Sequence, residues 1–204
     1  MEREGSVNAG SYRSFVFDLD RTLVTIPIDW VSVRKEVERI SGVTLDRTLM
    51  FLQLREILRR RPELRGPLFS TIDSFELKAA SGTKPMDGAL ELLGVLAGRA
   101  KVALVTLQGR PVCDEIARTL KMDGFFGARI TREDSLDRGE QIQMAVRAIR
   151  SSPELTLFVG DMENDVIGAR RARVEVAIMG NRPLGDQRPD HRFQNFAELR
   201  SFLT

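Results

Sequence analysis

Short apolar runs alternate with helical patterns along most of this 204-residue chain. Each run is rich in β-branched and aromatic residues, which is typical of a buried strand. Strands that alternate with helices are typical of parallel βαβ units. We therefore predict an α/β fold in which a Rossmann-like parallel sheet has helices on both faces. The predicted strands are Ser14–Asp18 and residues 101–106, 128–131, 155–160 and 174–179.

The stretches between and after these strands show the apolar spacing of helices. Leu92, Leu93 and Leu96 fall on one face of a helix over residues 89–96, and we expect Asp87 to be its N-cap. The other predicted helices lie around residues 116–120 and 142–149, and over residues 163–172 and 196–203.

Residues 25–84 interrupt this alternation. Three apolar stripes recur there at helical spacing, and Ser41-Gly42 and Ser81-Gly82 mark two helix ends. We predict a small helical cap over 25–84, inserted into a core made of 1–24 and 85–204, with joins near 25–27 and 83–85. Alternatively, these helices pack on the sheet as part of one domain. The stripes consist of Trp30, Val33, Val37 and Ile40; of Met50, Phe51, Leu54, Ile57 and Leu58; and of Ile72, Phe75 and Ala79.

The composition excludes several classes of protein. With 42% hydrophobic and 29% charged residues, the chain is neither disordered nor collagen-like. No run approaches the ~18 apolar residues of a membrane-spanning helix. One cysteine, Cys113, and one histidine, His191, exclude an intrachain disulfide and most zinc sites. The net charge of +2 does not imply nucleic-acid binding. Because the first residues lack the apolar stretch of a secretory signal, we expect a cytoplasmic protein. We also expect no membrane and no nucleic-acid partner. The oligomeric state stays open.

Two carboxylates follow the first predicted strand. Asp18 and Asp20 are separated by one residue in the segment DLDRT. Carboxylates at this spacing can share a divalent cation with water and backbone oxygens. An aspartate can also attack phosphorus and form an acyl-phosphate. The alternative is a strand that leaves the core through solvated acidic residues.

Further polar residues follow the other strands. Asp161 stands after strand 155–160, and Asp165 lies one helical turn later. Thr106 ends strand 101–106, and Arg138 precedes a predicted helix. Taken singly, these residues have ordinary explanations: an acidic helix N-terminus, a polar strand end and a surface arginine. Taken together, they stand at strand ends and helix starts on the edge of a parallel sheet where such sheets bind ligands.

At these positions the sequence resembles the haloacid dehalogenase-like superfamily. The segments FDLDRT and ALVT, then Arg138, then VGDMENDV match its four motifs in order. The resemblance covers the chain from about Ser14 to the C-terminus, and it implies a Rossmann-like core with a small helical cap after the first strand. The stretch KPMDGALELLGVLAGRAKVALVT also resembles the phosphoglycolate-phosphatase-like branch.

The resemblance implies a role for each of these residues. Asp18 would be the nucleophile that becomes phosphorylated, and Asp20 would protonate the leaving group and then activate water. Thr106 and Arg138 would bind the phosphoryl group. Mg²⁺ would offset the crowded negative charges. Its ligands would be Asp18, Asp161, Asp20 through its backbone carbonyl and, directly or through water, Asp165.

Two residues depart from the family pattern. Arg138 stands where lysine is more common, and the nearby Arg132 could fill the same cationic role. Arg21 stands where many relatives have glycine, directly beside the nucleophile. Neither change removes a catalytic carboxylate, so we expect the protein to be active.

The aspartate at position 20 separates branches of the superfamily. Dehalogenases lack it and the cation-pumping ATPases carry threonine there, whereas phosphatases and phosphomutases have it. We therefore expect a Mg²⁺-dependent phosphatase that hydrolyses a small phosphorylated metabolite, a phosphomonoester that the sequence does not name. The alternatives are a phosphomutase acting on a sugar phosphate, a non-catalytic binding module on the same fold, and a phospho-accepting domain like a response regulator.

Overall fold

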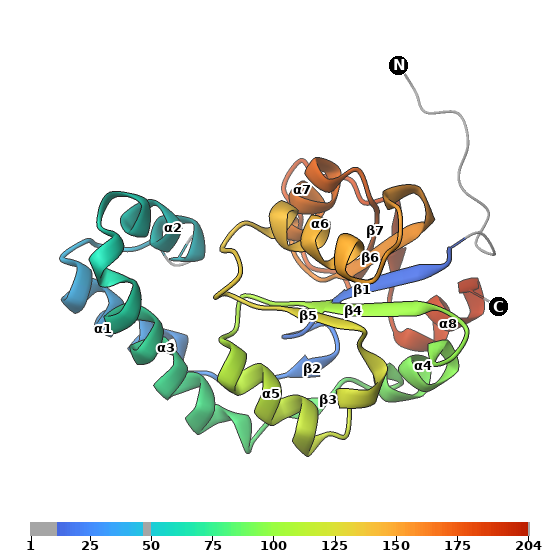
Figure 1. Ribbon diagram of the computed structural model, residues 1–204, viewed down its shortest axis with the longest axis horizontal. Coiled ribbons are helices and arrows are strands. Elements are labelled where there is room, and N and C mark those ends of the chain that lie inside the picture. Colours follow the sequence, from blue (N-terminus) through green and yellow to red (C-terminus); the bar gives the residue numbers. More distant parts are fainter. Residues whose placement is uncertain (1–11, 47–49, 204) are drawn as a thin grey trace.

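Six parallel strands form one sheet in the computed structural model, which describes residues 12–46 and 50–203. Every neighbouring pair of strands is parallel, and β1 lies inside the sheet between β4 and β6. The predicted Rossmann-like α/β fold is therefore confirmed (Figure 1). In spatial order, the strands are β5 (Ala128–Ile130), β4 (Lys101–Val105), β1 (Ser14–Asp18), β6 (Thr156–Gly160), β7 (Glu175–Met179) and β8 (His191–Phe193).

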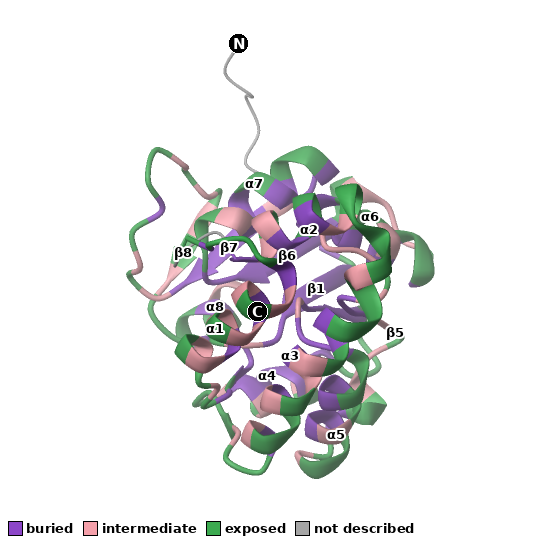
Figure 2. Cartoon of the chain, turned by 90° about the vertical axis from the view of Figure 1, so that its left-hand side faces the viewer, coloured by how far each residue is buried: buried purple, intermediate pink, exposed green. Residues whose placement is uncertain are grey.

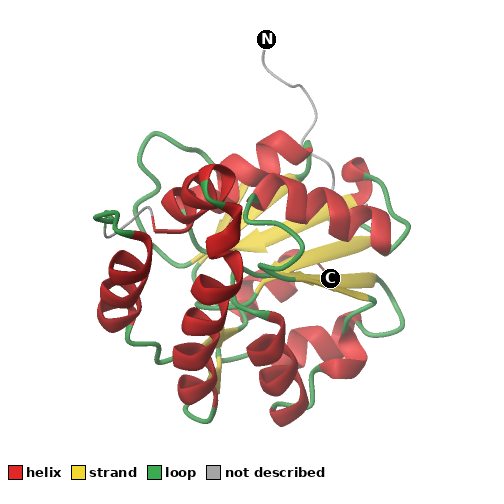
Figure 3. Cartoon of the chain, turned by 60° about the vertical axis from the view of Figure 1, so that its left-hand side comes forward, coloured by secondary structure: helices red, strands yellow, loops and turns green. Residues whose placement is uncertain are grey.

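Alternating side chains of the strands build a separate core on each face of the sheet. Phe15 and Phe17 of β1 pack in one core, and Val16 packs in the other. Because both faces are covered, all five residues of β1 are buried, as Figure 2 shows for the middle of the sheet. The first core also holds α4 (Ala89–Leu96), α5 (Arg110–Thr119) and α8 (Phe196–Leu203), and the second holds α6 (Arg138–Ala148) and α7 (Glu163–Ala172). Figure 3 shows the strands between these two layers of helices.

The predicted bounds of the helices over 89–96, 163–172 and 196–203 are confirmed. The predicted N-cap of the first of these helices is wrong. Gly88, rather than Asp87, occupies that position, and it makes no side-chain cap. Its φ of 80° is left-handed, and a Cβ there would lie 3.1 Å from Cβ of Phe196. A turn of this shape against α8 favours a residue without a side chain.

Residues 30–80 form three helices with an apolar cluster of their own. These are α1 (Trp30–Ser41), α2 (Met50–Arg60) and α3 (Arg65–Ala80). Asp29 caps α1 by accepting the N–H of Ser32 at 3.1 Å, and Gly42 ends it with a φ of 69°. None of the helices within residues 12–46 and 50–203 is long and apolar enough to cross a membrane. The fully buried members of the cluster are Val33, Val37, Leu54, Leu68 and Ile72.

The two connections between these helices and the rest of the chain lie side by side. The short strand β2 (Val24–Thr25) pairs antiparallel with β3 (Lys84–Pro85). This pairing supports the proposed division at residues 25 and 84. However, α3 also packs directly against α5 of the core, beside it in Figure 1. We keep the name cap for the segment 25–84.

Candidate active site

Three of the predicted site residues stand at the carboxyl ends of neighbouring strands. Asp18 is the last residue of β1 and is paired in register with Val105, the last residue of β4. Thr106 follows β4 directly, and Asp161 follows β6 directly. Because β4 and β6 flank β1, these three side chains emerge at one edge of the sheet. All three residues are buried.

The chain turns sharply after Asp18, and this turn places Asp20. The N–H groups of Leu23 and Val24 both donate to the carbonyl oxygen of Leu19 at 3.0 Å. Asp20 Oδ1 accepts the N–H of Ile26 at 3.0 Å. Arg21 takes a left-handed backbone with a φ of 64°, which explains why glycine suits this position.

Arg138 is the cation at the centre of the candidate site. Its buried guanidinium donates from Nη2 to Asp18 Oδ1 at 2.7 Å, and its Nε lies 3.0 Å from Asp165 Oδ1. The aliphatic part of the Arg138 side chain passes close to Gly168 of α7. A Cβ at position 168 would lie 2.5 Å from Cγ of Arg138. The close packing of α6 on α7 therefore requires glycine at position 168, and it fixes the place of Arg138.

Asp165 organises the turn between β6 and α7. Its Oδ2 accepts the N–H groups of Asp161 and Met162, each at 3.0 Å, while Oδ1 faces Arg138. A Cβ at Gly160 would lie 2.5 Å from Oδ2, so this approach also depends on a glycine. Both carboxylate oxygens of Asp165 therefore already have partners within the protein.

Three residues that the sequence analysis did not single out complete the surroundings. Gln141 Oε1 accepts from Arg138 Nη1 at 3.0 Å, and its Nε2 donates to the carbonyl of Thr106 at 2.7 Å. Gln108 hydrogen-bonds the hydroxyl of Thr106. Arg182, in the loop after β7, forms an ion pair with Asp161 Oδ2 at 3.0 Å. A polar residue three positions after Arg138, on a predicted helix face that is buried, was the available signal for Gln141.

Arg132, the alternative cation, lies with other partners. Its fully buried guanidinium pairs with Glu76 and Asp73 of α3 and donates to the carbonyl of Leu107 at 3.0 Å. The structure therefore brings Arg138, and not Arg132, into contact with Asp18.

Negative charge dominates this edge of the sheet. Burial raises the pKa of Asp18 well above its usual value, and the charges of Asp165, Asp161 and Asp20 raise it further, while Arg138 opposes the rise. Burial, followed by the charge of Asp165, raises the pKa of Asp161 to about 7, although Arg182 lowers it. The four aspartates are thus close enough to repel one another.

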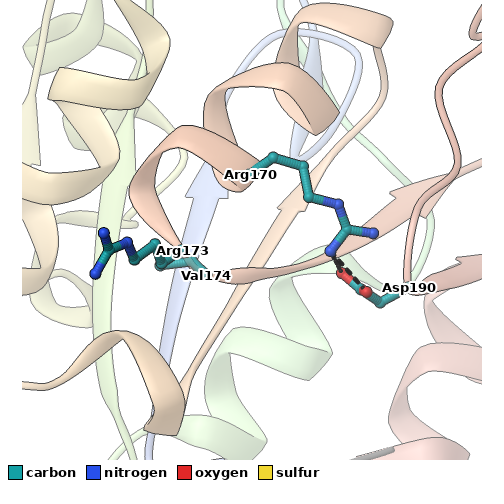
Figure 4. Close-up of a pocket in the computed structure, with 4 residues that line it drawn as sticks. All are labelled: Arg170, Arg173, Val174 and Asp190. Carbon is teal, nitrogen blue, oxygen red and sulfur yellow. Dashed lines mark hydrogen bonds and ion pairs between the residues drawn. The ribbon is translucent and has the colours of Figure 1, made fainter. Parts of the chain in front are cut away.

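The described surface has a groove that Arg138 of the candidate site helps to line. This groove, of about 120 Å³, runs between Leu52 and Arg55 of α2 and Arg138, Asn164 and Ile167 of the core. A larger groove, of about 370 Å³, lies at the opposite edge of the sheet, where β7 and β8 begin. Figure 4 shows that Arg170 there is turned to Asp190, and its Nη1 donates to both carboxylate oxygens at 2.8 and 2.9 Å.

A family model of the haloacid dehalogenase-like hydrolases matches residues 15–179, which include all the residues of the candidate site except Arg182. The chain belongs to this family. A solved structure of a hydrolase from Pseudomonas syringae has the same fold, with a TM-score of 0.75 and 21% identity over 94% of this chain and 98% of that one. A solved structure of the HAD-hydrolase YfnB from Bacillus subtilis, bound to magnesium, matches with a TM-score of 0.64 and 18% identity over 95% of this chain and 99% of that one.

Sequence similarity between this chain and a curated relative covers a shorter region. The pyrophosphatase PpaX of Anoxybacillus flavithermus is 29% identical over 111 residues, which are 50% of this chain and 52% of PpaX. The chain therefore spans about half the length of the curated relative in that match.

The oxygen donors at this edge of the sheet fit Mg²⁺ in their chemistry. Carboxylate and carbonyl oxygens are its preferred protein ligands, and it usually takes only one or two carboxylates and keeps several waters. Within residues 12–46 and 50–203, no three acidic, histidine or cysteine side chains are grouped so that they could hold a metal ion. A set made of Asp18, Asp161 and the carbonyl of Asp20 needs only two such side chains.

Proposed function

We propose that this hydrolase cleaves a small phosphomonoester through a phosphorylated Asp18, with Mg²⁺ as its cofactor. The observation that carries the proposal is the environment of Asp18. Its Oδ1 is held by Arg138 at 2.7 Å, and its Oδ2 accepts no hydrogen bond from the described part of the chain. A buried carboxylate with one oxygen fixed and the other available is suited to nucleophilic attack.

The reaction has two steps. An oxygen of Asp18 attacks phosphorus, the bond from phosphorus to the ester oxygen breaks, and Asp20 gives its proton to the departing alcohol. Asp20 then accepts a proton from water that attacks the same phosphorus, which releases phosphate and restores Asp18. Burial raises the pKa of Asp20, which favours the protonated form that the first step needs.

The groups around Asp18 would hold the substrate. The guanidinium of Arg138 and the hydroxyl of Thr106 would bind phosphoryl oxygens and keep phosphorus in line with Asp18. Asp18, Asp161 and the carbonyl of Asp20 would hold Mg²⁺, with Asp165 contributing through water. When bound, the metal ion offsets the repulsion between the carboxylates and the phosphoryl group.

The substrate class rests on the residues and on the relatives together. The pyrophosphatase activity in the name of PpaX belongs to that protein, and it supports phosphoryl chemistry for this one. Arg138 and Asp18 together provide a place for one phosphoryl group, so we propose a small phosphorylated metabolite as the substrate. We also propose a cytoplasmic location, where such metabolites are made and consumed.

Phosphate release with Mg²⁺ present tests the proposal. The panel contains p-nitrophenyl phosphate, pyrophosphate, a phosphorylated carboxylic acid and several sugar phosphates. We expect inorganic phosphate from at least p-nitrophenyl phosphate and from one natural ester at a higher kcat/KM. No release from any of these esters would contradict the proposal, and an isomerised sugar phosphate without inorganic phosphate would identify a phosphomutase instead.

A further inference from the structure

A buried ion pair joins the cap to the core beside the candidate site. Glu76 of α3 and Arg132, which follows β5 closely, both have fully buried side chains. Two contacts join them: Arg132 Nη1 to Glu76 Oε1 at 2.9 Å and Nη2 to Oε2 at 3.1 Å. Removing two charges from water is costly, and such a pair is a weak source of stability. A contribution to stability therefore does not explain why this ion pair is present.

The pair holds the backbone of three consecutive residues. Arg132 Nη1 donates to the carbonyl of Leu107 at 3.0 Å, and the N–H of Arg132 donates to the carbonyl of Gln108 at 3.2 Å. Glu76 Oε2 accepts the N–H of Gly109 at 2.9 Å. The loop 107–109, which follows Thr106 directly, is thus fixed from both sides.

Side chains of α3 and of Arg132 lie very close to the loop at Gly109. A Cβ there would lie 1.9 Å from Asp73 Oδ1 and 2.6 Å from Arg132 Nη2. The φ of Gly109 is −68°, a value that any residue adopts, so a larger residue there would displace the Asp73 and Arg132 side chains rather than strain the backbone. The sequence therefore accommodates close contact between the cap and the loop.

The loop also carries a free donor next to the proposed phosphate site. The N–H of Gln108 donates to the Thr106 hydroxyl at 3.2 Å, whereas the N–H of Leu107 has no acceptor within the described residues. An anion bound at Thr106 would find this donor beside it, because backbone N–H groups in loops are common partners of phosphate. The orientation of that donor follows from the contacts at Leu107, Gln108 and Gly109.

We propose that Glu76 and Arg132 are positioning residues, through which cap helix α3 sets the geometry of the phosphoryl-binding loop 106–109. This inference rests on the proposed function. It assigns to the cap a direct effect on phosphate binding, in addition to its contact with the rest of the substrate. Neither residue touches the reacting atoms.

The test replaces the ion pair with apolar residues of similar size, in the double variant Glu76→Leu/Arg132→Met. Apolar replacement of a buried pair is often neutral for folding, whereas loss of one partner is not. The control is Arg65→Met, because Arg65 also ties α3 to the core, at the carbonyl of Glu133 at 2.6 Å, but does not contact the loop.

Two readouts separate positioning from general stability. Amide hydrogen exchange of Gly109, whose N–H donates to Glu76, should become at least about tenfold faster in the double variant and stay unchanged in the control. Inhibition by inorganic phosphate should weaken by roughly 10- to 100-fold, and KM for p-nitrophenyl phosphate should rise by a similar factor, with a smaller change in kcat.

Each outcome decides the question. Wild-type exchange rates or an unchanged phosphate inhibition constant in the double variant would overturn the positioning role while leaving the proposed function intact. A wild-type protein without turnover or phosphate binding would instead overturn the proposed function, and the exchange data would still report on the loop. If the double variant does not fold, Glu76→Gln is judged by the same two readouts, with smaller shifts expected because one acceptor oxygen remains.

Discussion

Replacing Asp18 with asparagine is expected to lower phosphate release by roughly 10⁴-fold or more, the loss typical of removing a nucleophile. An amide does not attack phosphorus, and no other carboxylate of the site stands at the end of the central strand. The amide oxygen can still accept the hydrogen bond from Arg138 that Asp18 Oδ1 accepts at 2.7 Å. The change therefore removes the reacting group while it keeps the main contact. Steady-state release of p-nitrophenol measures the effect.

Stability serves as the check on this variant. Burial raises the pKa of Asp18, because a buried carboxylate is costly to keep charged. The asparagine variant avoids this cost, which offsets part of the free energy lost with the attraction to Arg138. We expect thermal unfolding within a few degrees of the wild type. Asp186→Asn, at an exposed carboxylate far along the chain, is the matched control and should keep full activity. Turnover above a tenth of the wild-type rate in Asp18→Asn would exclude Asp18 as the nucleophile.

Removing divalent cations is expected to lower turnover by roughly 10³-fold or more. The buried carboxylates Asp18, Asp20, Asp161 and Asp165 repel one another and would repel a phosphoryl group. Arg138 offsets only part of this charge. Dialysis against EDTA should therefore abolish phosphate release, and added Mg²⁺ should restore it in a saturable manner. Full activity in excess EDTA would contradict the metal requirement.

Thermal unfolding gives a second measure of the metal that does not depend on turnover. Mg²⁺ at about 100 times its Kd should stabilise the folded wild type by about 2.7 kcal/mol, which raises the Tm by several degrees. Asp161→Asn should lose most of this shift, because it removes one of the two carboxylates that we expect to bind the ion directly. An equal shift in that variant would place the metal elsewhere.

The convergence of the site could be predicted from the sequence because parallel strands share a polarity. Once Ser14–Asp18 and the runs before Thr106 and Asp161 were identified as strands, their carboxyl ends had to meet at one edge. The bounds of the helix over 163–172 could also be predicted, because the spacing of its apolar residues indicates which face of the helix is buried.

Other features depend on contacts that sequence spacing does not contain. Arg182 reaches Asp161 from a loop after β7, and Arg132 reaches Glu76 across 56 positions of the chain. From the sequence, Arg132 was an alternative for the phosphate-binding cation, and no role was predicted for Arg182. The short strand β8 and the pair of β2 with β3 were missed because two or three residues are too few to show a period.

Trapping of the phosphorylated protein tests the central claim most directly. In Asp20→Asn, p-nitrophenyl phosphate should still phosphorylate the protein, because its leaving group needs little help from an acid, but hydrolysis should be slow without the base. After an acid quench, peptide mass spectrometry should find one phosphoryl group on Asp18, and none in the double variant Asp18→Asn/Asp20→Asn. A phosphoryl group on another residue, or wild-type turnover with no phosphorylated protein in Asp20→Asn, would contradict this account.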